Sequence, residues 1–363
     1  MANSKSTVAI VKTSPSTILQ DYSKVMKLAG YEKALPKAKE TLLKLNLSWS
    51  LFYPACSTPP WQLEGVLKTM LADGYKKEKI HAVENKTVVT KPWKGAKGNK
   101  WLPVLDKYGL EFEPLTETEW VNYKPKHEML ALDHIFPDGH KIPKMFIGKN
   151  VVHLPTMKTH GHTTMTGAMK NAFGGLITER RHHSHKMIHE VLVDLLQIQK
   201  EIHPGIFAVM DGTVAGDGAG PRTMIPVVKN CILASSDQVA IDAVAAKMMG
   251  YDPMSIKFIK LAHDRGLGCG DVGQIDIAGI SKAEFNRTNW NFATKKSPVI
   301  FWDQVFRKGA LSFVEPLLFH TGLFQLCVFG SAFYHDSIWY NLVGRARINK
   351  FMNTDWGKLW QRY

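Results

Sequence analysis

The side chains best suited to chemistry are concentrated in one polar stretch of the chain. Lys158, His160, His162, Lys170 and Asn171 follow one another there, next to glycines and after an apolar run typical of a strand. A lysine ammonium can hold a carboxylate or phosphate as a point charge, and a histidine can transfer a proton or, when neutral, bind a metal. We predict that the two lysines neutralise an anion, that a histidine moves protons, and that Asn171 contacts the bound substrate or cofactor.

A second candidate segment begins at Asp211 and is rich in glycine. Exposed backbone amides in such a turn can bind an anion, so Gly212, Gly218 and Gly220 are the predicted contacts. Asp211 could orient a lysine or act as a base. The glycine spacing matches neither a P-loop nor a dinucleotide fingerprint, and a purely structural turn is the alternative. We expect this turn to face the lysine segment across one shared hollow.

Three side chains in these segments could bind a divalent metal ion. His160 and His162 would supply imidazole nitrogens and Asp217 a carboxylate oxygen. His185 and His189, four residues apart, offer a second spacing that suits a metal pair. Because the H-E-x-x-H arrangement is absent, a basic helix entrance exposed to solvent is the competing explanation for that pair. The identity of any cofactor therefore stays open.

The order of strand-like and helix-like stretches predicts how these residues are positioned. Apolar runs typical of strands alternate with segments of helical period in the first part of the chain, and a second α/β unit follows. This β-α-β-α order predicts an α/β fold with mainly parallel sheets flanked by helices. The expected strands are 8–12, 41–47, 80–83 and 206–210, and the expected helices are 18–29, 63–71, 101–108, 188–202 and 239–249.

Several caps and loops can also be assigned. Ser184 is a predicted helix N-cap, and the lysine-rich interval 86–100 is a predicted exposed loop. Asp237 suits the N-terminus of a helix. Asp242 falls inside an otherwise apolar helix and needs a buried partner, for which a lysine of the polar centre is the candidate.

The chain is long enough for two lobes and an extension, since single hydrophobic cores usually stop growing at roughly 250–300 residues. We predict an N-terminal α/β lobe over residues 1–140, a second α/β lobe carrying the main motifs over 141–285, and a helical, aromatic-rich extension over 286–363. The extension either docks on the body as a pair of helices or forms a membrane-surface or partner-binding patch within residues 301–360. Its charged residue, proline and glycines argue against a membrane span.

Charge and cysteine usage limit the partners. The chain carries 46 Lys and Arg against 32 Asp and Glu, a net charge of +14, which favours anionic partners such as phosphorylated ligands, acidic proteins or anionic lipid. No Arg-rich helix, aromatic-basic repeat or zinc-finger spacing is present, so nucleic-acid binding is not expected. The four cysteines form no C-x-x-C pair, so no intrinsic iron–sulfur cluster is expected. Without a secretory signal pattern, a cytoplasmic location is the default, with membrane association as the alternative.

Taken together, the motifs resemble the Domain of Unknown Function 362 family. The segments that carry the resemblance are Leu-Pro-x-x-Lys-Thr-His (154–160), Thr-Gly-Ala-Met-Lys-Asn-x-Phe-Gly (166–174), Asp-Gly (211–212), Gly-x-Gly-Pro (218–221), Ser-Ser-Asp-x-Val-Ala-x-Asp (235–242) and Gly-Tyr-Asp-Pro (250–253). Upstream, Lys44-Leu-Asn46 and Ser57-Thr-Pro-Pro60 resemble further family positions. The resemblance implies an α/β fold in which Lys44 and Asn46 contribute to the same cleft as the later motifs.

The resemblance brings no settled activity with it. Many family members carry a ferredoxin-like domain, whose cysteine runs are not found in this sequence, so we expect any electron transfer to need a separate redox partner. A shorter likeness places Lys170 where nickel-pincer lactate racemases have a nucleophilic lysine. The leading expectation is an enzyme of undetermined reaction that binds a small anionic substrate or cofactor between two lobes. The alternative is a non-catalytic membrane-surface or assembly factor that acts through its basic surface and apolar C-terminal segment.

Overall fold

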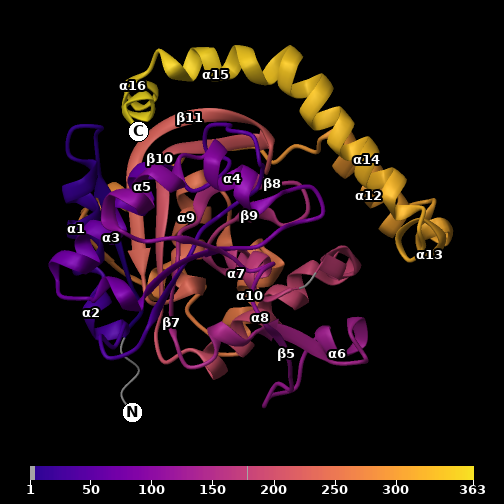
Figure 1. Ribbon diagram of the computed structural model, residues 1–363, viewed down its shortest axis with the longest axis horizontal. Coiled ribbons are helices and arrows are strands. Elements are labelled where there is room, and N and C mark those ends of the chain that lie inside the picture. Colours follow the sequence, from indigo (N-terminus) through magenta and orange to yellow (C-terminus); the bar gives the residue numbers. More distant parts are fainter. Residues whose placement is uncertain (1–4, 178) are drawn as a thin grey trace.

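The computed structural model describes residues 5–177 and 179–363 and is built around one large twisted sheet (Figure 1). In spatial order, its main path comprises β12 (Asp276–Ala278), β1 (Thr7–Lys12), β11 (Thr223–Ser235), β10 (Ile206–Ala219), β7 (Asn150–His153), β2 (Thr41–Lys44), β3 (Ile80–Glu84) and β4 (Phe112–Pro114). Two further strands, β8 (Thr156–His160) and β9 (Thr164–Thr166), branch from β10. The sheet therefore draws strands from both predicted lobes.

Most neighbouring strands run parallel. The pairs β2 with β3, β2 with β7, β3 with β4, and β10 with β7 and β8 are all parallel, whereas β11 is antiparallel to both β1 and β10. Parallel strands covered on both faces must be apolar almost throughout, and β2 is buried at all four of its positions. A separate antiparallel hairpin is formed by β5 (Trp120–Tyr123) and β6 (His140–Pro143).

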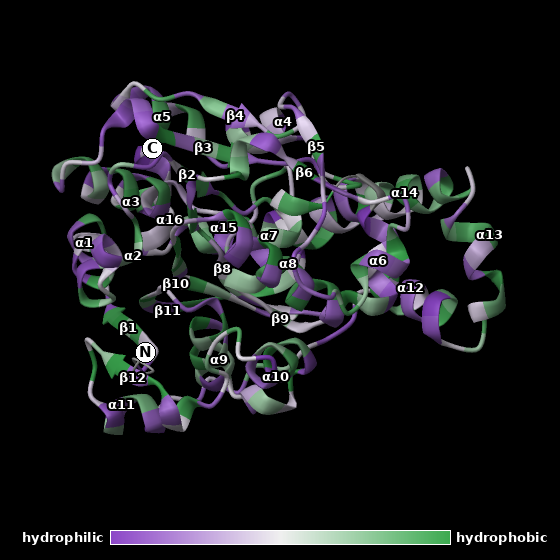
Figure 2. Cartoon of the chain, turned by 90° about the horizontal axis from the view of Figure 1, so that it is seen from below, coloured by the Kyte–Doolittle hydropathy of each residue, from purple (hydrophilic) through white to green (hydrophobic). Residues whose placement is uncertain are grey.

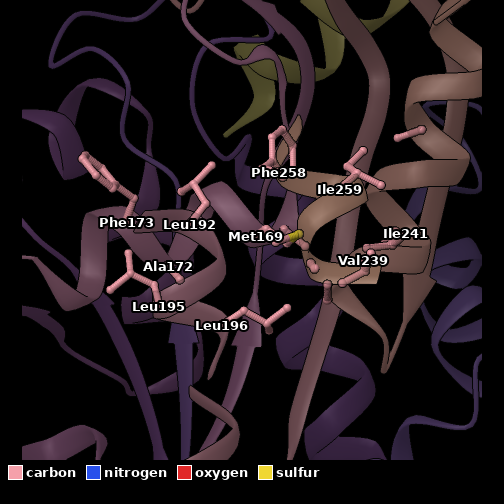
Figure 3. Packing of buried hydrophobic residues seen from close by; sticks show 14 of the residues in the cluster. Met169, Ala172, Phe173, Leu192, Leu195, Leu196, Val239, Ile241, Phe258 and Ile259 are labelled. Atoms are coloured by element: carbon pink, nitrogen blue, oxygen red, sulfur yellow. The ribbon is translucent and has the colours of Figure 1, made fainter. Parts of the chain in front are cut away.

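Helices cover both faces of the sheet, each over its own apolar cluster. One cluster includes side chains of α1 (Ile18–Leu28), α3 (Pro60–Ala72) and α5 (Trp101–Tyr108). The other is built from α7 (Ala168–Leu176), α8 (Ile188–Ile202), α9 (Gln238–Met249) and α10 (Lys257–Asp264). Figure 3 shows Met169, Leu192, Val239 and Phe258 of these four helices in one packed layer. The predicted α/β fold with a mostly parallel, helix-flanked sheet is confirmed.

The glycine-rich segment after Asp211 is a strand and not the predicted turn. Strand β10 continues through these glycines to Ala219 and pairs with β11 along its length. A Cβ added to Gly216 would lie 2.0 Å from the sulfur of Met224, and one added to Gly220 would lie 1.8 Å from the carbonyl oxygen of Thr159. Glycine is therefore required because neighbouring segments approach closely, a use that sequence alone does not distinguish from a turn.

Two smaller predictions also need correction. The interval 86–100 contains a short helix, α4 (Pro92–Gly98), which begins with proline at its first turn. Gly95 of this helix packs so closely on Leu47 that an added Cβ would lie 2.4 Å from it. Ser184 does not cap α8, because a 3-10 helix, η3 (Glu179–Met187), precedes that helix and contains the serine. The remaining short helices are α2 (Tyr31–Ala34), α6 (Leu132–Ile135) and α11 (Lys282–Arg287).

The C-terminal extension is helical, as predicted, and forms an arm along one side of the body (Figure 1). Its elements are α12 (Pro298–Lys308), α13 (Glu315–Phe319), α14 (Phe324–Ala332), the π-helix η7 (Phe333–Gly344), α15 (Arg345–Met352) and α16 (Asp355–Arg362). The last helix docks on the body, where Trp356 and Trp360 join the α1–α3–α5 cluster. In Figures 1 and 2, α12, α13 and α14 lie at the far end of the long axis, beyond the sheet.

Within the described residues, none of the helices has by itself the length and apolar character needed to cross a bilayer. Two successive helical segments, Ser312–Phe319 and Phe324–Met352, together have the length and apolar composition of a span, but they are bent by 90° relative to each other.

Candidate functional site

A cavity of about 560 Å³ lies where the carboxyl ends of strands β2 and β3 meet helix α7 and the C-terminal arm. Lys44 and Glu84, the last residues of those two strands, belong to its lining. This is the edge at which open α/β sheets bind ligands, because the loops there carry polar groups that the sheet itself cannot accommodate. The described lining residues come from both the sheet region and the arm.

The floor of the cavity contains a buried ion pair. The ammonium of Lys44 donates to Glu84 Oε1 at 2.7 Å and to the carbonyl oxygen of Leu45 at 2.7 Å. Burial lowers the pKa of Lys44 and raises that of Glu84, and the attraction between the two charges opposes both shifts. Gly174 and Gly175 of α7 lie directly over Lys44, where an added Cβ would come within 3.2 and 3.1 Å of its side chain. The glycine pair thus lets α7 pack onto the ion pair.

Next to this pair, two asparagines connect helix α7 with strands β2 and β7. Asn171 Nδ2 donates to the carbonyl oxygen of Lys44 at 2.9 Å and lies 3.3 Å from Nδ1 of His153. Its Oδ1 accepts from Asn46 Nδ2 at 3.3 Å. Both asparagines line the cavity, and their relative positions are held by these bonds.

Lys158 also holds this asparagine network in place, but it does not line the cavity. Its ammonium donates to Asn46 Oδ1 at 2.7 Å, to the carbonyl oxygen of Cys56 at 2.9 Å and to Thr156 Oγ1 at 2.5 Å. An ammonium has three N–H donors, so all of them are engaged by the protein. This arrangement favours a role for Lys158 in holding Asn46 in position over a direct role in neutralising a ligand.

Lys170 is placed by the N-terminus of α7. Asp242 of α9 accepts hydrogen bonds from the backbone amides of Ala168 and Met169, at 2.6 and 3.1 Å. The prediction that a lysine pairs with Asp242 is therefore wrong. The first amides of a helix have no partner within the helix, so they can satisfy a buried carboxylate as well as a lysine can. Gly167 precedes the helix, and any Cβ there would lie 2.0 Å from Asp242 Oδ1. The Thr-Gly-Ala-Met-Lys-Asn segment thus fixes the first turn of α7, and Lys170 follows on it.

The ammonium of Lys170 lines the cavity without a hydrogen-bond or ion-pair partner among the described residues. Burial, with Lys158 and Arg181 nearby, lowers its pKa to about 7. Arg181 and Arg222 also line the cavity, and neither forms an ion pair with a described carboxylate. Burial lowers the pKa of both guanidiniums. Uncompensated cations at a buried site are unfavourable without an anion.

Three of the four described histidines that line the cavity, His160, His162 and His185, lie next to one another. The ring centroids of His160 and His162 lie 5.7 Å apart, and those of His162 and His185 lie 5.3 Å apart. Burial lowers the pKa of all three, to about 4 for His162, with Lys170 acting in the same direction. These imidazoles are therefore neutral near pH 7.

The C-terminal arm closes the opposite wall. Gln304 of α12 donates to the carbonyl oxygen of Gly161 at 2.9 Å, and Asp303 lies 3.7 Å from His162 Nε2. Asp303 also pairs with Arg307 at 3.0 Å, so this arginine, unlike Arg222, is neutralised. The arm thus contributes polar contacts at its docking points and apolar side chains between them.

The other predicted site residues lie outside this cavity. Asp211 accepts from the Tyr22 hydroxyl at 2.6 Å, the Trp61 indole at 3.0 Å and Thr213 Oγ1 at 2.8 Å, and burial raises its pKa. Tyr22 and Trp61 belong to the cluster on the α1–α3 face, so the expected shared hollow is not formed by Asp211. Gly212, Gly218 and Gly220 are strand or strand-end residues and line no part of the cavity.

The predicted metal ligands are not assembled into one site. Asp217 accepts from the backbone amide of Ala293 at 2.9 Å and does not line the cavity that contains His160 and His162. His185 lies in the 3-10 helix, whereas His189 lies in α8 against Phe258. Over residues 5–177 and 179–363, no three or more His, Cys, Asp or Glu side chains are grouped so that they could hold a metal ion.

Sequence reasoning did not single out Glu84, Arg222 or the arm residues of the lining. Arg222 directly follows the Gly-x-Gly-Pro motif, and Asp303 and Arg307 stand four residues apart on a helix. These spacings were visible in the sequence, but only the tertiary structure shows that they reach the same cavity as Lys170.

The floor of the cavity lies within a region matched by a known family. The model of a domain of unknown function, DUF362, matches residues 41–247, more than half of the chain. This protein belongs to the DUF362 family. The DUF362 match includes Lys44, Lys170 and Asp242, whereas the arm that forms the opposite wall lies beyond its end.

This DUF362 chain is similar in sequence to one known protein and in structure to another. A thylakoid-associated protein of Synechocystis sp. is 25% identical over 238 residues, which cover 62% of this chain and 70% of that protein. A crystal structure of a Thermotoga maritima protein aligns with 69% of this chain and 59% of its own, at 12% identity and a TM-score of 0.39. The chain thus spans less than two thirds of the solved protein, and this structural likeness is too slight to bear on function.

Proposed function

We propose that this protein is an enzyme that binds a small anionic substrate or cofactor in the cavity beside Lys170. The observation that carries the proposal is the ammonium of Lys170, which lines the cavity without a hydrogen-bond or ion-pair partner among the described residues and lies near Arg181; Arg222 lines the same cavity. The two acidic lining residues, Glu84 and Asp303, are already paired with Lys44 and Arg307. The excess positive charge of the lining therefore matches an anionic ligand.

The proposed chemistry is proton transfer to or from the bound anion. His160 and His162 are neutral near pH 7 because burial lowers their pKa, so either could act as a general base. Lys170, with a pKa of about 7, could hold the anion when protonated and act as a base when neutral. Clusters of titratable groups with strongly shifted pKa values are typical of functional sites.

A ligand screen by thermal denaturation tests the proposal. Phosphate, pyrophosphate and di- and tricarboxylic acids should include compounds that raise the melting temperature of the wild type, since a ligand that binds only the folded state stabilises it. The increase should disappear in Lys170→Met. The control is Lys24→Met, which removes the same charge from an exposed position on α1. Equal stabilisation of wild type and Lys170→Met would contradict the proposal.

A second candidate is a non-catalytic membrane-surface or assembly factor. The observation in its favour is the exposed apolar surface of the arm, which includes Phe313, Leu326 and Phe329. This function requires no anion in the cavity. Vesicle or partner binding that is unchanged by Lys170→Met, in a protein that no small anion stabilises, would favour it.

A further inference from the structure

The cavity has two chemically different halves. The cations Lys170 and Arg181 lie in the half formed by the body, and Arg222 of the body donates to Ser331 Oγ of the arm at 3.4 Å. The half formed by the arm is lined mainly by apolar side chains, including Ile300, Phe306, Phe319, Phe324 and Val328. A small inorganic anion would engage only the first half, because an apolar wall gains nothing from contact with a charge.

The arm is attached at both ends of the cavity wall. On one side, Ile300 of α12 packs against Gly161, where an added Cβ would lie 2.9 Å from its side chain. On the other side, Asp336 of η7 accepts from the Trp49 indole at 2.7 Å, and Tyr340 donates to the carbonyl oxygen of Phe52 at 3.0 Å. The wall is therefore a built part of the cavity.

The outer surface of the same helices is also apolar. Leu326 and Phe329 of α14 are 68% and 70% exposed, and Phe313 is 76% exposed. Figure 2 shows hydrophobic residues along α12, α13 and α14 at the end of the molecule. Large apolar side chains exposed on neighbouring helices are typical of an interaction site.

Basic residues precede and follow this apolar segment in the sequence. Residues 309–344 contain no lysine or arginine, and their only acidic residues are Glu315 and Asp336. Exposed cations precede this interval at Lys295, Lys296 and Lys308 and follow it at Arg345 and Lys350. Apolar and aromatic side chains bordered by lysine and arginine are typical of helices that lie in the interface of an anionic bilayer. The charge pattern favours a bilayer over an acidic protein, because the apolar interval itself has no cations to pair with carboxylates.

We infer that the arm docks on an anionic lipid bilayer and that the cavity receives from it an amphiphile with an anionic head and a long apolar chain. This inference rests on the proposed anion binding and names the class of ligand. The head would lie against Lys170 and Arg181, and the chain would follow the wall formed by α12 and α14. The same helices would then contact the bilayer with their outer face and the apolar chain of the ligand with the face that lines the cavity.

A comparison of two probes tests the ligand class. Inorganic phosphate and dodecyl phosphate share a head, and each buried methylene should strengthen binding about fourfold. Isothermal titration should therefore show dodecyl phosphate, below its micelle concentration, binding at least about tenfold more tightly than phosphate. Lys170→Met should weaken both, whereas Val328→Asn, which makes the wall polar, should weaken only dodecyl phosphate. Circular dichroism of each variant confirms folding.

The outcomes separate this inference from the function on which it rests. Equal, Lys170-dependent affinity for both probes would leave anion binding intact and overturn the amphiphile. Failure of both probes to bind would argue against both claims. Dodecyl phosphate binding that Lys170→Met leaves unchanged would show adsorption to the arm surface and would also overturn the inference.

Vesicle co-sedimentation tests the docking surface. Vesicles of phosphatidylglycerol and phosphatidylcholine should recruit the full-length protein, and vesicles of phosphatidylcholine alone should recruit less of it. Phe329→Glu should reduce recruitment several-fold. The matched control is Ile147→Glu, which changes an exposed apolar residue of the body that is 46% exposed. Equal recruitment of wild type and Phe329→Glu, or equal loss in the control, would overturn bilayer docking by the arm.

Discussion

At the scale of single residues, Lys44 and Lys170 show how one side-chain type takes two roles in the same cavity. Lys44 is neutralised by Glu84 at 2.7 Å, and two glycines of α7 pack over the pair. Lys170 lines the cavity and has no hydrogen-bond or ion-pair partner among the described residues, although its ammonium lies 5.5 Å from the centre of the Phe173 ring. The first lysine therefore stabilises the floor, and the second is available to a ligand.

The pH dependence of anion binding should report on Lys170. Its pKa of about 7 in the free protein results from burial and from Lys158 and Arg181. A bound anion would raise this pKa, so affinity should be highest below about pH 7 and should fall by up to about tenfold per pH unit above it. Isothermal titration from about pH 6 to pH 9 measures this slope, and buffers of different ionisation enthalpy measure the accompanying proton uptake.

Two controls apply to that experiment. The slope should vanish in Lys170→Met. His160, His162 and His185 cannot produce it, because their pKa values are lowered and they titrate on the acidic side. An affinity that stays constant across this range in the wild type would be inconsistent with an ammonium that changes its charge on binding.

At the scale of elements, the position of α7 depends on one carboxylate of α9. Asp242 joins the two helices by accepting from the amides of Ala168 and Met169. Gly167 leaves room for the contact. Because Lys170 lies in the first turn of α7, this junction sets where its ammonium can reach.

Removal of the cap should destabilise the protein. Asp242→Ala leaves two buried amides without their acceptor, at a cost of about 1–3 kcal/mol each, and should lower the free energy of unfolding by about 2–4 kcal/mol. Asp242→Asn retains a carbonyl acceptor and should cost less. Urea denaturation measures both changes. Equal stability of Asp242→Ala and wild type would show that the cap is dispensable.

The same carboxylate should make stability depend on pH. Burial raises the pKa of Asp242 to about 7, above its ordinary value of 3.8. The stability that protonated Asp242 contributes to the folded state is therefore fully present below about pH 4. It is lost as the pH rises towards 7, because this carboxyl ionises first in the unfolded chain. The difference in unfolding free energy between Asp242→Asn and wild type should therefore shift in favour of the variant as the pH rises from about 4.5 to about 7. A parallel pH profile for the two proteins would contradict the shift.

At the scale of the whole molecule, the arm connects two distant regions of the body. Its last helix fills the α1–α3–α5 cluster, where the rings of Trp356 and Trp61 lie 5.2 Å apart and those of Trp360 and Phe52 lie 3.8 Å apart. Its first helices form a wall of the cavity. The arm is therefore anchored through the same core that supports the sheet.

This anchoring predicts an effect on global stability. Trp356→Ala removes a side chain that is buried in the core and should lower the free energy of unfolding by about 3–5 kcal/mol. Trp93→Ala is the matched control, because Trp93 is half exposed on α4. Thermal and urea denaturation of both variants provide the comparison. A small effect at Trp356, similar to that at Trp93, would mean that the arm and body unfold independently.

The sequence by itself determined the α/β fold, the helical C-terminus and the family motifs, because hydrophobic period and motif spacing are local properties. It also identified Lys44, Asn46, Lys170 and Asn171, which the structure brings together at the carboxyl edge of the sheet. Local pattern could not decide whether Asp211 faced this edge, since successive residues of a strand point to opposite faces. The local pattern also predicted a turn after Asp211, where the glycines are instead required by the close packing of strand β10 on its neighbours. Lys170, Arg222 and the arm line one cavity although they are far apart in the chain, and only tertiary packing decides such an arrangement.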